Sequence, residues 1–400
     1  MNTSAPELSA ALAARFAESA LAAQPDYERD LAELVGIDSG STDAAGVKRV
    51  ADWVEARLAR LEFRVVRHSD PTGVWGDALV ATRRGTGTKR IVLFAHMDTV
   101  FEIGDAAARP FRVDERGHGR GPGVTDDKAG VVASLHAAEH LIALGEESYG
   151  ELVLVYTPDE EIGSPFGAGV LRVASEGADA ALCMECAREN GDLVVARKGV
   201  ADLEVVVRGK AAHSGIEPER GAHAGVEAAH LTLFLQGLAD PQAGVTVNVG
   251  VLRAGDRLNI VPDHASLHVE VRATVAADLD ATLAQIRARV AATQTSGTSA
   301  EIVSIDHCPP MEASAAGLAL AERAVAIAGT LGFAPGLART GGVSDANRIA
   351  ARGVPTLDGL GPVGGGDHSE SEWLDLSSVP QRVALLATLI AEIGSNPEIV

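Results

Sequence analysis

Cysteine is scarce in this chain, which has three among its 400 residues, Cys183, Cys186 and Cys308. Three cysteines are an unlikely basis for a disulfide scaffold. Cys183 and Cys186 have the CxxC spacing of a redox pair or half a zinc site, but the chain has no second CxxC. The pair also ends an apolar run instead of opening a helix. We therefore interpret both as packing thiols beside Glu185, with the redox pair as the alternative.

Positive charge is also in deficit, with 34 Lys and Arg against 55 Asp and Glu and a net charge of -21. Nucleic acids and anionic membranes would repel such a chain, so we expect neither as a partner. The simpler interpretation is that the excess of acid only keeps the protein in solution.

Long hydrophobic runs are missing as well, and none approaches the length of a membrane span. The Ala-rich stretch 10–23 is interrupted by Arg15 and Glu18, and no basic segment precedes it. This pattern favours an amphipathic helix over a signal peptide. We expect a cytoplasmic protein.

The length predicts two domains, and 46% hydrophobic residues are enough to fill their cores. Residues 90–95 are apolar at nearly every position, which is typical of a central strand covered on both faces. Alternating strands and helices elsewhere predict an α/β catalytic domain with a mixed sheet covered by helices. Further strands are expected at 63–67, 77–82, 151–156 and 178–184, and helices at 26–36, 44–61, 130–144, 315–330 and 378–394.

The pattern changes between residues 198 and 308. Its order is strand, helix, two strands, helix, strand, which matches a ferredoxin-like α+β unit. The expected strands are 201–208, 244–253, 264–273 and 299–305, and the helices are 221–237 and 277–293. We therefore predict an inserted lid or dimerisation domain at 198–308, with the catalytic domain made of 1–197 and 309–400.

Five stretches place possible metal ligands at the end of a predicted strand or in a loop. They contain His96 with Asp98, Asp126, Glu160 with Glu161, Glu185, and His368. The two imidazoles and three of these carboxylates suit a carboxylate-bridged pair of divalent ions that leaves room for water and substrate. Each signal alone is weak among 12 His and 55 acidic residues, but their joint position after strands favours a hydrolase.

Spacing indicates separate roles within these stretches. Asp98 can accept a hydrogen bond from the imidazole nitrogen of His96 that does not bind metal. Asp126 follows a Gly-rich turn that opens a helix, where a carboxylate could bridge two ions. Of the adjacent Glu160 and Glu161, one would bind metal and the other would move protons. His136 and His140 lie in an Ala-rich helix without a metal motif and are interpreted as structural.

Four motifs carry a resemblance over roughly residues 30–395. They are HMDTV at 96–100, GPGVTDDK at 121–128, DEEIG at 159–163 and HS at 368–369. Together they resemble the dinuclear zinc metallopeptidases that include glutamate carboxypeptidase of the G type, aminoacylase, acetylornithine deacetylase and succinyl-diaminopimelate desuccinylase.

The resemblance implies a role for each ligand. Asp126 would bridge two ions, His96 and Glu185 would complete one site, and Glu161 and His368 would complete the other. Glu160 would be the general base. Zn2+ is the expected metal, although Mn2+ and Co2+ accept the same ligands.

The predicted inserted domain is similar to the same family. The segment GKAAHSG at 209–215 resembles one whose histidine, here His213, reaches the active site of a partner subunit and polarises the scissile carbonyl. The resemblance thus implies a homodimer formed through this domain. A surface loop is the alternative for His213.

Asn259, Arg272, and Arg339 with Gly341 match family groups that bind the substrate carboxylate. A strand arginine paired to a local glutamate is the alternative for Arg272. Two arginines and an amide suit a small molecule or peptide with a free carboxylate.

These residues predict hydrolysis of an amide bond next to a free carboxylate, as in the glutamate carboxypeptidase branch. The RKG segment at 197–199 departs from that branch and is commoner among other carboxypeptidases and deacylases. An N-acyl-amino-acid deacylase or dipeptidase therefore remains an alternative. A non-catalytic binding protein on the same fold is the alternative of another class.

Overall fold

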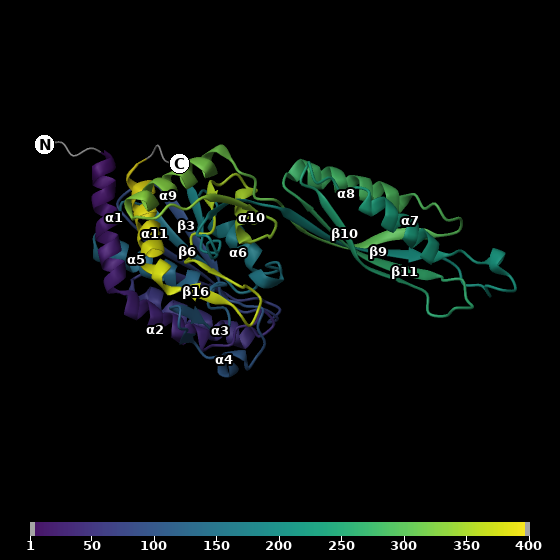
Figure 1. Cartoon of the computed structure of the whole chain (residues 1–400), viewed down its shortest axis with the longest axis horizontal. Coiled ribbons are helices and arrows are strands. Elements are labelled where there is room, and N and C mark those ends of the chain that lie inside the picture. The colour runs from purple at the N-terminus through teal and green to yellow at the C-terminus, as the bar shows by residue number, and fades with distance from the viewer. Residues whose placement is uncertain (1–4, 397–400) are drawn as a thin grey trace. The chain divides into compact units, whose positions relative to one another are not determined.

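A computed structural model describes residues 5–396 and divides into two compact units (Figure 1). Unit 1 contains the described residues up to Val195, together with Ala313–Arg339 and those from Ser344 onward. Unit 2 contains Ala196–Glu312 and Thr340–Val343. The functional bounds of 198–308 for an inserted domain stay a prediction.

A six-stranded mixed sheet forms the centre of unit 1, in the order β1-β2-β6-β3-β7-β14. Strands β6, β3, β7 and β14 are mutually parallel neighbours, whereas β1 and β2 pair antiparallel. The bounds are β1 Arg64–His68, β2 Ala78–Arg84, β3 Arg90–His96, β6 Glu151–Thr157, β7 Ala180–Cys183 and β14 Thr356–Leu357. The predicted mixed α/β fold is confirmed.

Helices cover this sheet. Figure 1 shows α5 and α11 to one side of β3 and β6, and α6 to the other. Burial of Ile91 through His96 along β3 agrees with cover on both faces. The helices of unit 1 are α1 Ala5–Ala22, α2 Gln24–Val35, α3 Ala44–Arg60, α4 Asp105–Ala108, α5 Lys128–Ala143, α6 Gly167–Ala174, α9 Ala315–Thr330, α10 Asp345–Ala350 and α11 Val379–Ser395.

Segment Leu376–Ser395, which contains α11, is long and apolar enough to cross a membrane by length and composition alone. Its apolar window is 89% buried within the structure. A core helix of a folded domain has these properties, and α11 packs against α1, α5 and α9.

A small four-stranded sheet in unit 1 was not predicted from the sequence. Its order is β15-β16-β5-β4, and its strands have only two or three residues each. Such short strands carry no readable hydrophobic alternation. The bounds are β4 Arg112–Val113, β5 His118–Arg120, β15 Gly364–Gly365 and β16 Trp373–Asp375, and a separate pair is formed by β8 Leu193–Arg197 and β13 Leu337–Thr340.

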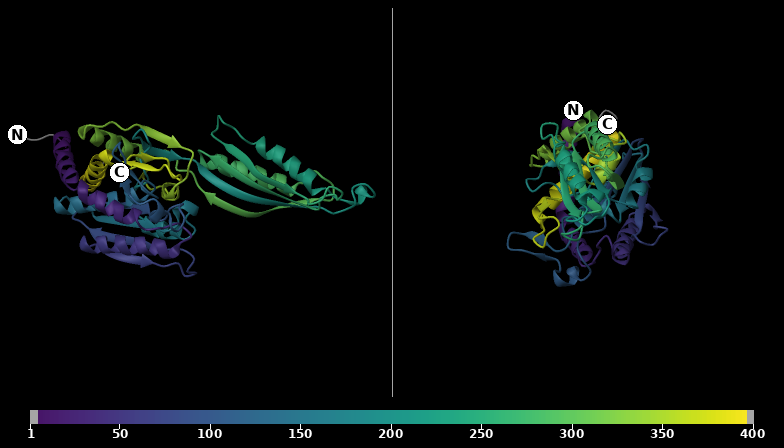
Figure 2. Two further views of the ribbon diagram at one scale, coloured as in Figure 1. Left: turned by 60° about the horizontal axis from the view of Figure 1, so that its bottom comes forward. Right: turned by 90° about the vertical axis from the view of Figure 1, so that its right-hand side faces the viewer.

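Unit 2 is an antiparallel sheet in the order β10-β11-β9-β12, with α7 and α8 on one face (Figure 2). Read from β12 to β10 and numbered in chain order, the strands are arranged 4-1-3-2, as in a ferredoxin-like unit. Alternate residues of β9, such as Leu203 and Val205, are buried under the helices. The bounds are β9 Gly199–Arg208, α7 Ala224–Gln236, β10 Thr246–Ala254, β11 His264–Ala273, α8 Ala276–Ala291 and β12 Ser299–Cys308.

Candidate metal centre and active site

Three neighbouring parallel strands deliver polar side chains to one edge of the unit 1 sheet. His96 is the last residue of β3, Glu160 and Glu161 begin a 3-10 turn after β6, and Glu185 follows β7. Parallel strands end at the same edge, so their following residues converge there.

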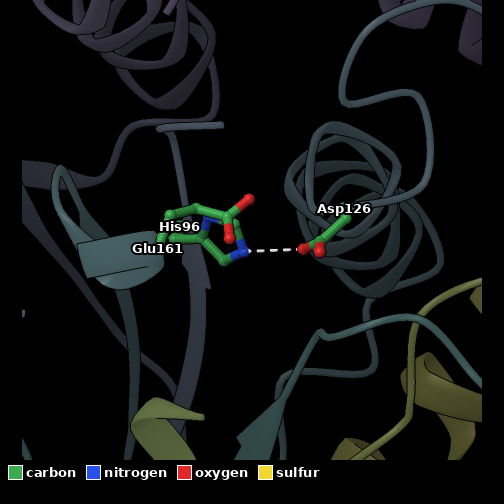
Figure 3. A group of neighbouring side chains, drawn as sticks. All are labelled: His96, Asp126 and Glu161. Atoms are coloured by element: carbon green, nitrogen blue, oxygen red, sulfur yellow. Dashed lines mark hydrogen bonds and ion pairs between the residues drawn. The ribbon is translucent and has the colours of Figure 1, made fainter. Parts of the chain in front are cut away.

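Asp126 joins this group from the loop between β5 and α5. Its Oδ1 lies 2.9 Å from Nε2 of His96, and its Oδ2 lies 3.3 Å from Nε2 of His368. Figure 3 shows Asp126 facing His96 and Glu161 from the opposite side. Each carboxylate oxygen thus faces a different imidazole, which is the geometry that a bridging ligand needs.

Two further carboxylates lie beside these imidazoles. Oε2 of Glu161 is 2.9 Å from Nε2 of His368, and Oε1 of Glu185 is 3.6 Å from Nε2 of His96. Within the described residues, two sets of donor atoms come close enough to hold a metal, and His96 belongs to both. One set is His96, Asp126 and Glu161, and the other is His96, Glu160 and Glu185.

Negative charge is concentrated in this group. Burial, and next the charge of Glu185, raise the pKa of Glu160 well above its usual value. Burial likewise raises the pKa of Glu161. Hydrogen bonding to Asp126 and Glu161 raises the pKa of His368 to about 11. Carboxylates and imidazoles crowded in this way fit divalent cations such as Zn2+, which would neutralise the charge.

Asp98 is fully buried behind His96. Its Oδ1 is 3.3 Å and its backbone carbonyl oxygen is 3.0 Å from Nδ1 of His96. Its two carboxylate oxygens also accept hydrogen bonds from the backbone N–H groups of Glu160 and Glu161, at 3.1 and 3.2 Å. Ser41 donates a third, at 2.6 Å. Asp98 therefore lies where it can orient both the imidazole and the Glu160–Glu161 turn.

Two buried acids near the group were missed by the sequence analysis. Asp345 accepts hydrogen bonds from the hydroxyls of Thr157, at 2.9 Å, and Ser164. Glu372 accepts three backbone N–H groups from the loop of Asp126. No sequence signal separates Glu372 from the neighbouring Glu370, because only tertiary contacts show which of them is buried.

The remaining predicted residues lie outside this group. His213 is exposed on unit 2 and forms an isolated bridge with Ile260, and Ser214 N–H donates to the carbonyl of Asn259 at 3.0 Å. The segments of His213 and Asn259 are therefore adjacent within unit 2. Arg339 is an exposed residue of unit 1.

Arg272 has two partners within unit 2. Its Nη2 donates to Glu270 at 2.7 Å, and its Nη1 donates to the carbonyl of Gly341 at 2.8 Å. The pairing with a local glutamate, the alternative raised by the sequence, is thus present. A guanidinium has five N–H donors, so this pairing leaves donors for a ligand.

The comparison with protein families matches residues 92–392 to Peptidase family M20/M25/M40. The chain belongs to this family. The resemblance seen in the sequence is thereby confirmed, and the M20 chain is a hydrolytic metallo-enzyme.

Individual relatives extend the comparison. Carboxypeptidase G2 of Pseudomonas sp. (strain RS-16) is 34% identical over 379 residues, which are 93% of this M20 chain and 90% of the relative. Acetylornithine deacetylase of Myxococcus xanthus is 31% identical over 62% of this chain and 67% of its own. The crystal structure of aminopeptidase PepT from Bacillus cereus matches with a TM-score of 0.77 and 25% identity, covering 92% of this chain and 98% of that one.

Proposed function

We propose that this M20 hydrolase binds two divalent ions and cleaves an amide bond next to a free carboxylate, releasing a C-terminal amino acid. The observation that carries the proposal is the placement of Asp126, whose two oxygens face His96 and His368 separately. A carboxylate whose two oxygens face different imidazoles would hold two divalent ions, one on each oxygen.

We assign the ligands accordingly. His96 and Glu185 complete one ion site, and Glu161 and His368 complete the other. The donor set of imidazole nitrogen and carboxylate oxygen suits Zn2+ best, and Mn2+ or Co2+ also fit. When bound, such ions polarise a carbonyl and lower the pKa of a water.

Glu160 is the proposed general base and acid. Its backbone is held by Asp98, its side chain lies within the donor group, and its neighbour Glu161 already faces His368. A carboxylate in that place can take a proton from the attacking water and return it to the departing amine.

Three residues of unit 2 and Arg339 of unit 1 supply the proposed substrate contacts. Arg272 and Asn259, with Arg339 and Gly341, would bind the free carboxylate, because a guanidinium fork matches that group. The carboxypeptidase relative, 34% identical over most of both chains, supports this substrate class. His213 would polarise the scissile carbonyl of a partner subunit in a homodimer formed through residues 198–308.

A deacylase is the second candidate, supported by the 31% identity to acetylornithine deacetylase. A dipeptidase is a third, since it needs the same ions and base. The three differ in the group recognised beside the amide and not in the proposed chemistry.

A substrate panel tests the proposal. Purified protein is stripped with a chelator, reconstituted with Zn2+, Mn2+ or Co2+, and assayed on N-aroyl-L-glutamate, its α-carboxamide analogue, N-acetylornithine and free dipeptides. We expect the glutamate conjugate to give the highest kcat/KM and the α-carboxamide to lose at least tenfold, because a carboxylate–guanidinium contact is removed. Preference for N-acetylornithine or a free dipeptide would instead assign one of the alternatives.

A further inference from the structure

The loops of Asp126 and His368 extend from one small sheet. Strand β5 leads into the loop of Asp126, and the loop of His368 connects β15 to β16. Strands β16 and β5 pair antiparallel, with Leu374 opposite Gly119. The pairing of β16 with β5 therefore connects the Asp126 loop to the His368 loop, although the two are about 250 residues apart in sequence.

Glu372 links the two loops directly. It belongs to the His368 loop, and its side chain is buried, with the residue 2% exposed. Its Oε2 accepts the N–H of Gly123 at 2.9 Å, and its Oε1 accepts those of Thr125 at 2.8 Å and Asp126 at 3.0 Å. These three bonds tie the side chain of Glu372 to the turn that carries Asp126.

The loop of Asp126 leaves little room for other arrangements. Gly123 has φ of +66°, and a Cβ on it would lie 2.4 Å from Cγ2 of Thr99. Below the same turn, Nζ of the buried Lys128 donates to the carbonyls of Ile37 at 2.8 Å and Pro122 at 3.4 Å. Glu372 therefore binds a turn whose conformation is also restricted by Gly123 and by the hydrogen bonds of Lys128.

His368 has an unusual backbone conformation. Its φ of +60° lies in the left-handed region, which a non-glycine residue occupies at some cost in free energy. The turn after it closes through the N–H of Glu372 and the carbonyl of Ser369 at 3.2 Å, and Arg120 donates to the carbonyl of Ser371 at 2.6 Å. Such conformations persist only when their surroundings fix them.

We propose that Glu372 is a positioning residue, which sets the spacing between Asp126 and His368 and so controls the ion that these two share with Glu161. The carboxylate oxygens of Glu372 face backbone N–H groups of the Asp126 loop. The inference rests on the proposed dinuclear centre and adds a residue to it. The other ion also shares Asp126, but its remaining ligands, His96 and Glu185, come from strands β3 and β7, which Glu372 does not hold, so that ion should be less affected.

The test is Glu372→Gln, followed by calorimetric titration of the stripped protein with Zn2+ or Mn2+. The amide keeps the shape of the side chain but turns a donor toward at least one of the three backbone N–H groups. We expect one of two ions to bind about 10- to 100-fold more weakly, as is typical when a partner of a ligand is lost. The affinity of the other ion should change less than threefold.

Glu227→Gln is the matched control in unit 2. Glu227 is also buried and accepts the backbone N–H groups of Gln294 at 2.8 Å and Thr295 at 2.7 Å, together with Arg289 at 2.9 Å. We expect this variant to lose stability and keep both ion affinities. If Glu372→Gln does not fold, Glu372→Asp carries the test, because it keeps the carboxyl group on a shorter side chain and should weaken the same single ion by a smaller factor.

Two results separate the inference from the proposed function. Two ions in the wild type with both affinities unchanged, or lowered equally, in the Glu372 variant would overturn the inference alone. Fewer than two ions in the wild type would overturn the dinuclear centre and the inference with it. Selective loss of one ion supports both.

Discussion

Glu160 and Glu161 are neighbours in sequence, yet their side chains have different surroundings. Oε2 of Glu161 lies 2.9 Å from His368, whereas Glu160 lies in the donor set that contains His96 and Glu185. Both backbones are held by Asp98. Two chemically identical residues can therefore take different roles, which leads to two predictions.

Glu160→Gln should lower kcat by about 10²–10⁴-fold, because the variant cannot accept a proton at that position. KM and the number of bound ions should stay near their wild-type values, because no ligand is removed. Steady-state kinetics with metal analysis checks this. The exposed Glu176→Gln is the control, and wild-type turnover in Glu160→Gln would assign the base elsewhere.

Glu161→Gln should instead weaken one ion by at least tenfold, because a ligand is replaced by a poorer one. Activity should then recover in part when excess Zn2+ is added. Equilibrium dialysis across a range of Zn2+ concentrations measures the change. Full ion content at low Zn2+ in this variant would contradict the assignment.

At the scale of elements, helices α1 and α5 meet through a buried histidine. Nδ1 of His140 on α5 lies 2.9 Å from Oγ of Ser19 on α1, and its Nε2 is buried without a partner among the described residues. Burial, assisted by the charge of His136, lowers the pKa of His140 to about 4. The interface thus favours a neutral imidazole at His140.

This interface predicts acid sensitivity. The unfolded chain, with an ordinary histidine pKa near 6.5, binds more protons than the folded one between pH 6.5 and about 4. The free energy of unfolding should therefore fall as pH drops through that window, by about 2–3 kcal/mol from His140. Urea unfolding at several pH values checks this. His140→Gln should flatten the profile.

At the scale of the whole molecule, the proposed catalytic groups are divided between two units. The proposed metal ligands belong to unit 1 and His213 belongs to unit 2. If His213 serves a partner subunit, Glu160→Gln and His213→Ala subunits should each be inactive alone and regain part of the activity when mixed. One site of the hybrid would then combine an intact Glu160 with the partner's intact histidine.

Affinity tags that differ between the two variants isolate this hybrid for assay. His213→Ala alone should keep its ions and its oligomeric state, as checked by light scattering. Purified hybrids that remain inactive would exclude action across a dimer interface.

Metal removal should affect stability as well as activity. An ion that binds only the folded state stabilises it by about 4 kcal/mol at a concentration 1,000 times its Kd. Chelation should therefore lower Tm, since the carboxylates around Asp126 and Glu161 would repel one another without cations. Differential scanning calorimetry measures the shift. Glu161→Gln protein should show a smaller shift than the wild type.

Much of the fold followed from local sequence patterns. The predicted strand at 90–95 is β3, Arg90–His96, and the strand predicted at 264–273 is β11 at the same bounds. Continuous or alternating hydrophobicity reports burial directly, so such elements can be recognised without tertiary information. The four motifs between His96 and Ser369 also carried the resemblance to the family, because they occur together in one order.

Only the tertiary structure shows which distant segments contact one another around the candidate site. The short strands β5 and β16 and the bonds from Glu372 to the turn of Asp126 join segments about 250 residues apart, and no local periodicity encodes them. The same holds for the bond from Arg272 to the carbonyl of Gly341, which depends on the loop after β13 lying beside β11. Hydrophobic burial leaves a repeating pattern in the sequence, whereas a single hydrogen bond between distant polar groups leaves none.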